Sequence, residues 1–283
     1  MRVIRDYLWK AIGPVILSAL SLFIGFFILQ PIALALDPTF SLLASRGTGK
    51  VAFITMVIFQ VVLLLSIQSK KFFNQFLKTN LYFFKDAKWL KTFFKYFVIF
   101  FFLHLLTFST FYFAGYSFFV STWGAWSFSL ISRIGFGFFV AFLLAWTEEL
   151  IFRGTLFPYF EQTFSQIGSV FITSFIFMIV HDLQQPWRLL TTNIKLGLGL
   201  FLLGLLLNLV FAVTRKLYVG MGIHAGIVAV KVFFRRVPCI KFVDSSLWSW
   251  WVHKDLRQSY LVHFLFLLSI LIFGYVNRKK LLK

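Results

Sequence analysis

The chain has 283 residues, of which 60% are hydrophobic and only 13% are charged. This composition excludes an ordinary soluble domain, because several apolar runs reach the roughly 20 residues that a helix needs to cross a hydrocarbon core about 30 Å thick. The net charge of +19 comes from 28 Lys and Arg residues that lie mainly between the apolar runs, where they meet anionic headgroups, so the charge indicates a lipid bilayer and not a nucleic acid as partner.

The apolar runs predict an all-α fold, a polytopic membrane helix bundle of about eight transmembrane helices. A membrane β-barrel is excluded because the runs do not alternate apolar and polar residues. The first run, residues 12–36, exceeds the roughly 7–15 apolar residues of a signal peptide, so we expect an uncleaved helix. The other expected helices cover residues 51–67, 96–119, 134–163, 168–181, 196–213, 217–234 and 260–276.

Basic residues between the helices set the expected orientation. Residues 68–96 carry seven lysines against one acidic residue, with phenylalanines interleaved. We expect a cytoplasmic loop that lies partly on the bilayer surface as an amphipathic helix. Eight helices with the N-terminus inside place this loop, the basic pair at 215–216 and the basic C-terminal tail in the cytoplasm. The basic residues within 235–241 are the exception, because the same topology places them outside.

Two adjacent acids, Glu148 and Glu149, stand out in the fourth expected helix. The chain has only three glutamates, and these two closely follow the apolar residues 138–145. An ionisable group at bilayer depth costs roughly 2.5–3.5 kcal/mol, so it indicates a functional site. Glu149 and Arg153 are four residues apart and can pair on a helix, whereas Glu148 is rotated about 100° away. We therefore expect Glu149 to be structural and Glu148 to be free as a base.

Two histidines are candidates to meet Glu148. His181 ends the fifth expected helix, and His224 lies within the seventh. At 1.5 Å per residue, Glu148 lies about 22 Å and His181 about 20 Å from the cytoplasmic ends of their helices, so the two reach a similar depth. His224 lies only about 12 Å in, and we expect it to line the same cavity from the cytoplasmic side. The sequence thus permits one buried Glu/His/His site open to the cytosol.

At this point the chain resembles a known family of intramembrane proteases. Residues 148–153 (EELIFR) match EExxxR, residues 177–181 (FMIVH) match FxxxH, and His224 follows on the next helix but one. This order is similar to that of the CAAX-protease and bacteriocin-processing family (CPBP, or ABI), which includes the Rce-type prenyl-protein endopeptidases. The resemblance divides the chain into N-terminal helices with the basic loop (1–129), a CPBP-like catalytic helix bundle (130–235), and a loop with the last helix (236–283).

The resemblance implies a role for each site residue. Glu148 and His181 would activate a water for attack on a peptide carbonyl. Glu149 with Arg153 would brace the site. His224 would support the oxyanion that develops on the substrate.

One departure from the family pattern concerns the oxyanion. The family usually has an Asn or Asp four residues after the last histidine, and this chain has Val228 there. Valine donates no hydrogen bond, and the loss of one oxyanion donor costs about 10²–10³ in rate. Asn208, in the sixth expected helix, is a candidate for the missing amide.

The need for a metal stays open at this point. The chain has no HExxH segment, which would place two zinc ligands and a base on one helix. Two histidines and a glutamate can nevertheless hold zinc, and members of the family are often labelled metalloproteases. The likeness to Rce-type enzymes favours a glutamate-activated water without a tightly bound metal, and we expect no other required cofactor.

We expect a multi-pass protein of the cell membrane, an endopeptidase that cleaves a membrane-embedded or lipidated, CAAX-type substrate. One alternative is a weakened or inactive family member that acts as a membrane scaffold or immunity protein, which Val228 favours. Another is a transporter in which Glu148 and Glu149 relay protons or cations. The chain shows no internal repeat of transporter type, so the transporter is the less favoured alternative.

Overall fold

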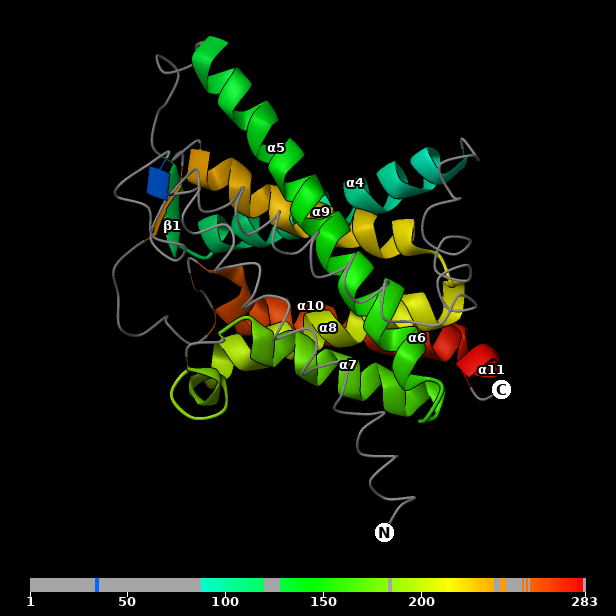
Figure 1. The fold of residues 1–283 in the computed structure, drawn as a ribbon. Helices are drawn as coiled ribbons and strands as arrows, with labels where there is room; N and C mark the ends of the chain where they lie inside the picture. Colours follow the sequence, from blue (N-terminus) through cyan, green and yellow to red (C-terminus); the bar gives the residue numbers. More distant parts are fainter. Residues whose placement is uncertain are drawn as a thin grey trace.

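The computed structural model describes residues 34–35, 88–119, 128–182, 185–236, 240–242, 251, 253 and 255–281. Apart from residues 34–35, the first two expected helices lie outside the described residues, as does most of the basic loop. Helices dominate the described part, in agreement with the predicted fold class (Figure 1).

The described elements follow the expected order along the chain. They are α4 (Lys88–Phe113), β1 (Ser117–Phe119), α5 (Phe128–Glu149), η3 (Leu150–Leu156), α6 (Phe157–Phe160), α7 (Gln166–Val180), η4 (Pro186–Leu189), α8 (Ile194–Thr214), α9 (Leu217–Arg236), β2 (Ile240–Phe242), η5 (Leu256–Gln258), α10 (Tyr260–Val276) and α11 (Arg278–Leu281). The last four expected helices coincide with α7, α8, α9 and α10 to within two residues at each end. The fourth corresponds to α5, η3 and α6 together.

The third expected helix was wrong at both ends. α4 begins at Lys88 and not at residue 96, so the end of the lysine-rich segment belongs to this helix. The helix ends at Phe113, and residues 117–119 form β1, which pairs antiparallel with β2. The all-α prediction missed this short two-stranded sheet, because three residues are too few to show an alternating pattern.

Four helical stretches in the described part are long and apolar enough to cross a membrane. They are Lys88–Phe113, Leu130–Phe160, Ile194–Thr214 and Leu217–Phe234. The helices α7 and α10 are also apolar but have only 15 and 17 residues. The protein is thus an integral membrane helix bundle, and the number eight stays a prediction.

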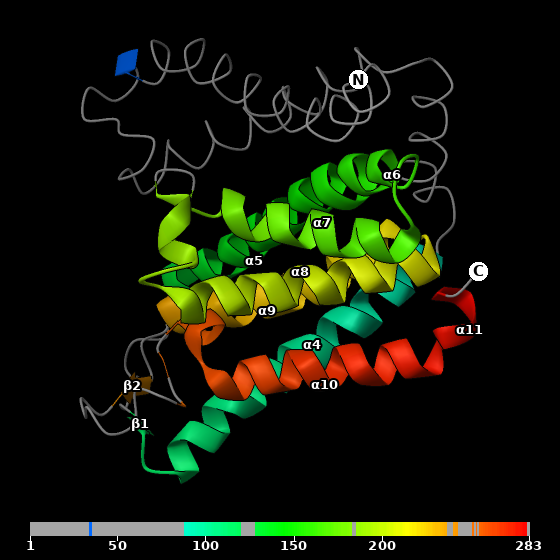
Figure 2. The same cartoon turned by 90° about the horizontal axis from the view of Figure 1, so that it is seen from below.

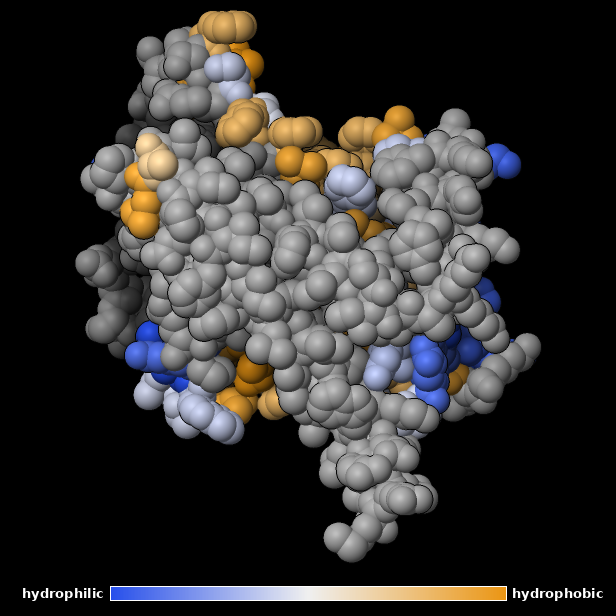
Figure 3. Space-filling model, viewed as in Figure 1, coloured by the Kyte–Doolittle hydropathy of each residue, from blue (hydrophilic) through white to orange (hydrophobic). Residues whose placement is uncertain are grey.

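The outer surface of the bundle suits contact with lipid. Phe102 and Leu106 of α4 and Leu271 of α10 are each more than half exposed. On the face shown in Figure 3, hydrophilic atoms gather near η4 at the lower left and near α11 at the lower right, with hydrophobic atoms between them. Lipid tails are as apolar as these side chains, so such exposure is tolerated inside a bilayer.

α9 packs against α4 and α5, and α8 packs against α7 and α10 (Figure 2). Two glycines allow the close approach of α9 to α4. A Cβ atom at Gly222 or Gly226 would lie 2.5 Å from the carbonyl oxygen of Phe93 or Phe97, respectively. Small residues at such interfaces let two backbones come close. This contact fixes the position of α9, which carries His224.

Candidate active site

The two adjacent glutamates lie where α5 changes into η3, a stretch of π-helix. The N–H of Phe157 donates to the carbonyl of Phe152, and the hydroxyl of Thr155 donates to the carbonyl of Leu150, five residues back in each case. Such wide turns are rare and frequently occur at functional sites. The EExxxR motif therefore lies on a locally altered helix that continues directly into α6.

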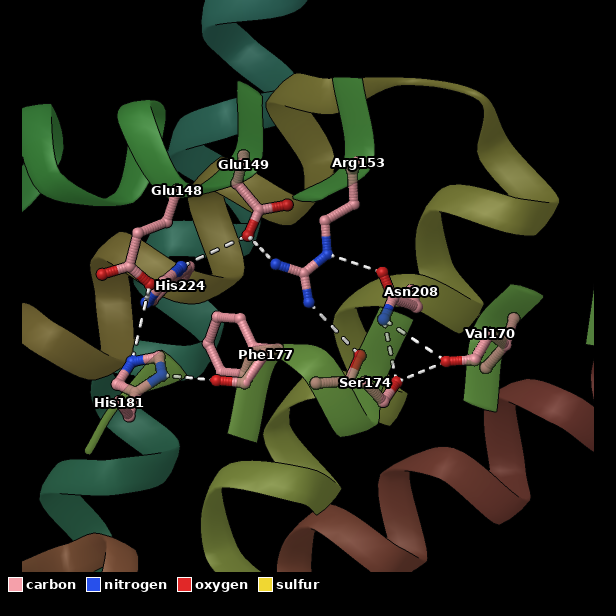
Figure 4. Close-up of polar contacts among 10 residues, drawn as sticks. Glu148, Glu149, Arg153, Val170, Ser174, Phe177, His181, Asn208 and His224 are labelled. Atoms are coloured by element: carbon pink, nitrogen blue, oxygen red, sulfur yellow. Dashed lines mark hydrogen bonds and ion pairs between the residues drawn. The ribbon is translucent and has the colours of Figure 1, made fainter. Parts of the chain in front are cut away.

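Glu148, His181 and His224 converge from three elements of the fold (Figure 4). The Oε2 atom of Glu148 lies 3.8 Å from Nε2 of His181 and 3.7 Å from Nε2 of His224. Both distances exceed that of a hydrogen bond. Within the part of the chain that the structure describes, Glu148 Oε2 has no hydrogen-bond partner. The fold thus brings together the three residues that the sequence grouped, although His224 was expected to lie at a shallower depth.

The hydrogen bonds of His181 and His224 indicate which ring nitrogen of each carries the proton. His181 Nδ1 lies 2.6 Å from the carbonyl oxygen of Phe177, and His224 Nδ1 lies 3.2 Å from Oε1 of Glu149. Carbonyl and carboxylate oxygens accept hydrogen bonds, so both Nδ1 atoms are donors. In the neutral rings, each Nε2 atom then faces Glu148 with a lone pair. Glu148 Oε2 and the two Nε2 atoms are thus three hydrogen-bond acceptors that face one another. Acceptors in this arrangement need a donor between them, and a water molecule can donate two hydrogen bonds.

Exposure divides the site into a partly accessible half and a buried half. The side chains of His181 and Glu148 are 22% and 16% exposed, whereas those of Glu149 and Arg153 are 1% and 0% exposed. Of the two carboxylates, Glu148 is therefore the more accessible.

Arg153 is fully buried, and each nitrogen of its guanidinium has an acceptor. Nη1 donates to Oε1 of Glu149 at 3.0 Å, which is the predicted ion pair. Nε donates to Oδ1 of Asn208 at 2.8 Å, and Nη2 donates to the carbonyl of Gly204 at 3.3 Å. The guanidinium carbon also lies 5.0 Å from the ring centroid of Phe177, a cation–π contact. These partners make a buried charge tolerable.

Glu149 has a second partner that the sequence did not reveal. Its Oε1 atom accepts from Arg153 Nη1 and also from His224 Nδ1, so Glu149 connects the arginine to the histidine. A glycine makes room for it, since a Cβ atom at Gly220 would lie 2.6 Å from Glu149 Oε2. The available signal was the spacing of Gly220 and His224, four residues apart on one face of a helix.

Asn208 does not lie where the oxyanion hypothesis needs it. Its Nδ2 atom donates to Oγ of Ser174 at 2.8 Å and lies 3.5 Å from the carbonyl oxygen of Val170, while its Oδ1 accepts from Arg153. Both ends of the amide are thus used on the side of Arg153 away from the two histidines (Figure 4). Ser174 was missed altogether, because a lone serine in an apolar helix usually bonds only to its own backbone.

Asp255, Arg257 and Lys231 form a charged cluster beside η5. Arg257 donates to Asp255 from Nε at 3.0 Å and from Nη2 at 2.7 Å, and Lys231 Nζ lies 3.4 Å from the same carboxylate. Burial raises the pKa of Asp255, but the hydrogen bonds and charge of Arg257, together with the charge of Lys231, outweigh burial and hold that pKa well below its usual range. At pH values above the ordinary pKa of a carboxyl group, the cluster therefore stabilises this segment. This stabilisation is lost only when strong acid protonates Asp255.

A comparison with known protein families agrees with the motifs. Residues 130–230 match the family model described as type II CAAX prenyl endopeptidase Rce1-like. Residues 130–230 are a domain of the Rce1-like family. This Rce1-like domain contains both motifs and His224, and it extends from α5 into α9. No curated protein and no solved structure gives a significant match to the chain.

In their chemistry, the side chains of Glu148, His181 and His224 suit zinc, because catalytic zinc is held by imidazoles and carboxylates. Their geometry does not suit zinc: among the described residues, no group of three or more His, Cys, Asp or Glu side chains is arranged to hold a metal ion. The label metalloprotease gains no support from this part of the chain.

Proposed function

We propose that this protein is an intramembrane endopeptidase that hydrolyses a peptide bond of a membrane-embedded or lipidated, CAAX-type substrate. The observation that carries the proposal is the convergence of Glu148 Oε2 with the Nε2 atoms of His181 and His224, at 3.8 and 3.7 Å. The match to the Rce1-like family supports the class of reaction and of substrate.

Glu148 is the general base in this proposal. It takes one proton from a water molecule, while His181 Nε2 accepts a hydrogen bond from the other hydrogen and orients the water. The hydroxide adds to the carbonyl carbon of the peptide bond and gives a tetrahedral oxyanion. When the intermediate collapses, the C–N bond breaks, and the proton held by Glu148 passes to the leaving amine. General acid–base catalysis of this kind contributes about 10²–10⁴ in rate.

His224 is the side chain proposed to support the oxyanion. Its Nδ1–H is directed at Glu149, so its Nε2 becomes a donor only when the ring takes a second proton. Val228 lies one helical turn later on the same face of α9 and adds no donor. The oxyanion therefore depends on one side chain where the family usually has two.

We propose that both termini lie in the cytoplasm, following the distribution of basic residues. Arg215, at the turn between α8 and α9, and Lys280 of α11 line the same pocket, so the turn and the basic tail lie at one end of the bundle. This shared position is what the proposed topology requires.

The test is cleavage of a fluorogenic peptide that carries a prenylated cysteine near its C-terminus, with purified protein in lipid nanodiscs. We expect the wild type to cleave it, and His181→Ala to lower kcat by about 10² or more, because the water then loses its second acceptor. His253→Ala is the matched control, since this histidine is partly buried outside the site, and it should keep wild-type activity. We expect phenanthroline to leave the rate unchanged.

Three outcomes would contradict parts of this proposal. Full activity of His181→Ala would remove that residue from the site. Inhibition by the chelator that is reversed by zinc would show a metal-dependent step. Failure of the wild type to cleave any lipidated peptide would favour the alternative, an inactive membrane scaffold or immunity protein.

Val228 is the observation that favours that alternative, and Val228→Asn tests it. Asn208 is engaged with Arg153 and Ser174, so its amide is not free to act as a second oxyanion donor. We expect Val228→Asn to raise kcat, by up to about 10²-fold, since one oxyanion donor contributes that much. Val228→Leu is the control and should not raise it. A gain below threefold for the asparagine variant would show that another donor already serves the oxyanion.

A further inference from the structure

We propose that Asn208 and Ser174 are positioning residues, which hold Arg153 and, through it, Glu149 and His224 in the working arrangement. The kinetic consequence rests on the proposed function, whereas the hydrogen bonds belong to the fold itself. The proposal gives Asn208 a different role from the oxyanion support expected of it from the sequence.

A run of hydrogen bonds leads from α7 through α8 to η3. Ser174 Oγ donates to the carbonyl oxygen of Val170 at 2.6 Å and accepts from Asn208 Nδ2 at 2.8 Å. Asn208 Oδ1 then accepts from Arg153 Nε at 2.8 Å. The run begins on α7, passes through α8 and ends on the motif helix, as Figure 4 shows.

The direction of every bond in this run is determined. A guanidinium nitrogen only donates, so Asn208 must present its oxygen to Arg153 and its NH₂ group to Ser174. The hydroxyl hydrogen of Ser174 is then left for the carbonyl of Val170. The amide of Asn208 cannot be turned around without placing two donors against each other, and this fixes the tilt of the guanidinium.

The second half of the run reaches the reacting groups. Arg153 Nη1 donates to Oε1 of Glu149 at 3.0 Å, and the same oxygen accepts from His224 Nδ1 at 3.2 Å. This bond keeps the proton of His224 on Nδ1 and directs Nε2 toward Glu148. A change in the tilt of Arg153 therefore changes how Glu149 meets His224.

Burial makes these bonds hard to replace. Asn208, Ser174 and Arg153 are each 0% exposed, so no solvent takes the place of a lost partner. A Cβ atom at Gly204 would lie 3.1 Å from Cα and 3.2 Å from Cβ of Ser174, which shows how closely α8 approaches α7 here. The carbonyl of Gly204 also accepts from Arg153 Nη2. The α7–α8 pair thus serves as the rigid support for the arginine.

The variants are Asn208→Leu, which removes both halves of the amide, and the milder Ser174→Ala, which removes one hydroxyl. Thr173→Val is the matched control: Thr173 is also 0% exposed on α7, and its hydroxyl has no hydrogen-bond partner among the described residues. We expect Asn208→Leu to lower kcat about 10–100-fold with little change in KM, the range known for supporting partners of a site. Ser174→Ala should show a smaller loss in the same direction, and Thr173→Val none.

A second readout needs no substrate. Solid-state ¹⁵N spectra of histidine-labelled protein in bilayers, above pH 8, report which ring nitrogen of His224 carries the proton, with His224→Gln assigning the signal. We expect Nδ1–H in the wild type and in Thr173→Val, and a shift toward Nε2–H in Asn208→Leu. Wild-type kcat and the wild-type tautomer in folded Asn208→Leu and Ser174→Ala proteins would overturn the proposal. A tautomer change in a protein that cleaves no peptide would instead uphold the positioning and refute the proposed function.

Discussion

Glu148→Gln is expected to lower kcat by about 10²–10⁴-fold, with little change in KM, in the prenylated-peptide assay. Glutamine has the size of glutamate but cannot take a proton from water. The carboxylate oxygen that faces His181 and His224 has no hydrogen-bond partner among the described residues, so its role is not the support of a neighbour. The substitution should therefore leave the melting temperature unchanged or raised, because catalytic groups are commonly placed at some cost in stability.

The control for this prediction is Glu161→Gln, which changes the third and last glutamate of the chain. Glu161 accepts from both Nη atoms of Arg215, at 2.5 and 2.6 Å, at the end of the bundle that carries α11. Its substitution should leave kcat within about twofold, since surface ion pairs contribute only about 0–1 kcal/mol. More than a tenth of wild-type activity in Glu148→Gln would contradict its assignment as the base.

Arg153→Met is expected to destabilise the fold by about 3–5 kcal/mol, the largest effect on stability that we predict. The substitution removes the cation and leaves Glu149 as a buried charge without its ionic partner. It also leaves Asn208 Oδ1 and the carbonyl of Gly204 without their donor. The measurement is thermal unfolding in detergent, together with the yield of folded protein from the membrane fraction.

A double substitution separates the lost charge pair from the lost packing. Arg153→Met combined with Glu149→Gln should recover more than half of the stability, because no buried charge is then left alone. Arg215→Met is the matched control, since it breaks the Arg215–Glu161 pair, whose arginine is 47% exposed, and should cost about 0–1 kcal/mol. Equal melting temperatures for Arg153→Met and Arg215→Met would show that burial does not decide the role of Arg153.

The sequence was sufficient for four helices because the bilayer favours their length and composition. The run 260–276 was predicted with the bounds that α10 has, and α7, α8 and α9 differ from their predicted bounds by no more than two residues. The failures lie where that constraint ends. α4 extends into the lysine-rich segment, since lysine stems can lie along a helix at the interface while their charges reach water. The sheet of β1 and β2 joins segments more than 100 residues apart, and local pattern does not encode such pairing.

The sequence by itself predicted one site for Glu148, two histidines and an Arg–Glu pair. Helical spacing paired Glu149 with Arg153, and the resemblance to the protease family implied the roles of Glu148 and the histidines. The sequence placed Glu148 apart from Arg153 by helical rotation alone. Only the tertiary structure decided that Glu149 bonds to Arg153 and His224 at once, and that Asn208 holds the arginine and not the oxyanion. These contacts join residues 51 to 75 positions apart. They depend on how closely the helices approach one another. The lack of a side chain at Gly220 leaves room for Glu149 against α9, and the lack of one at Gly204 lets α8 approach α7.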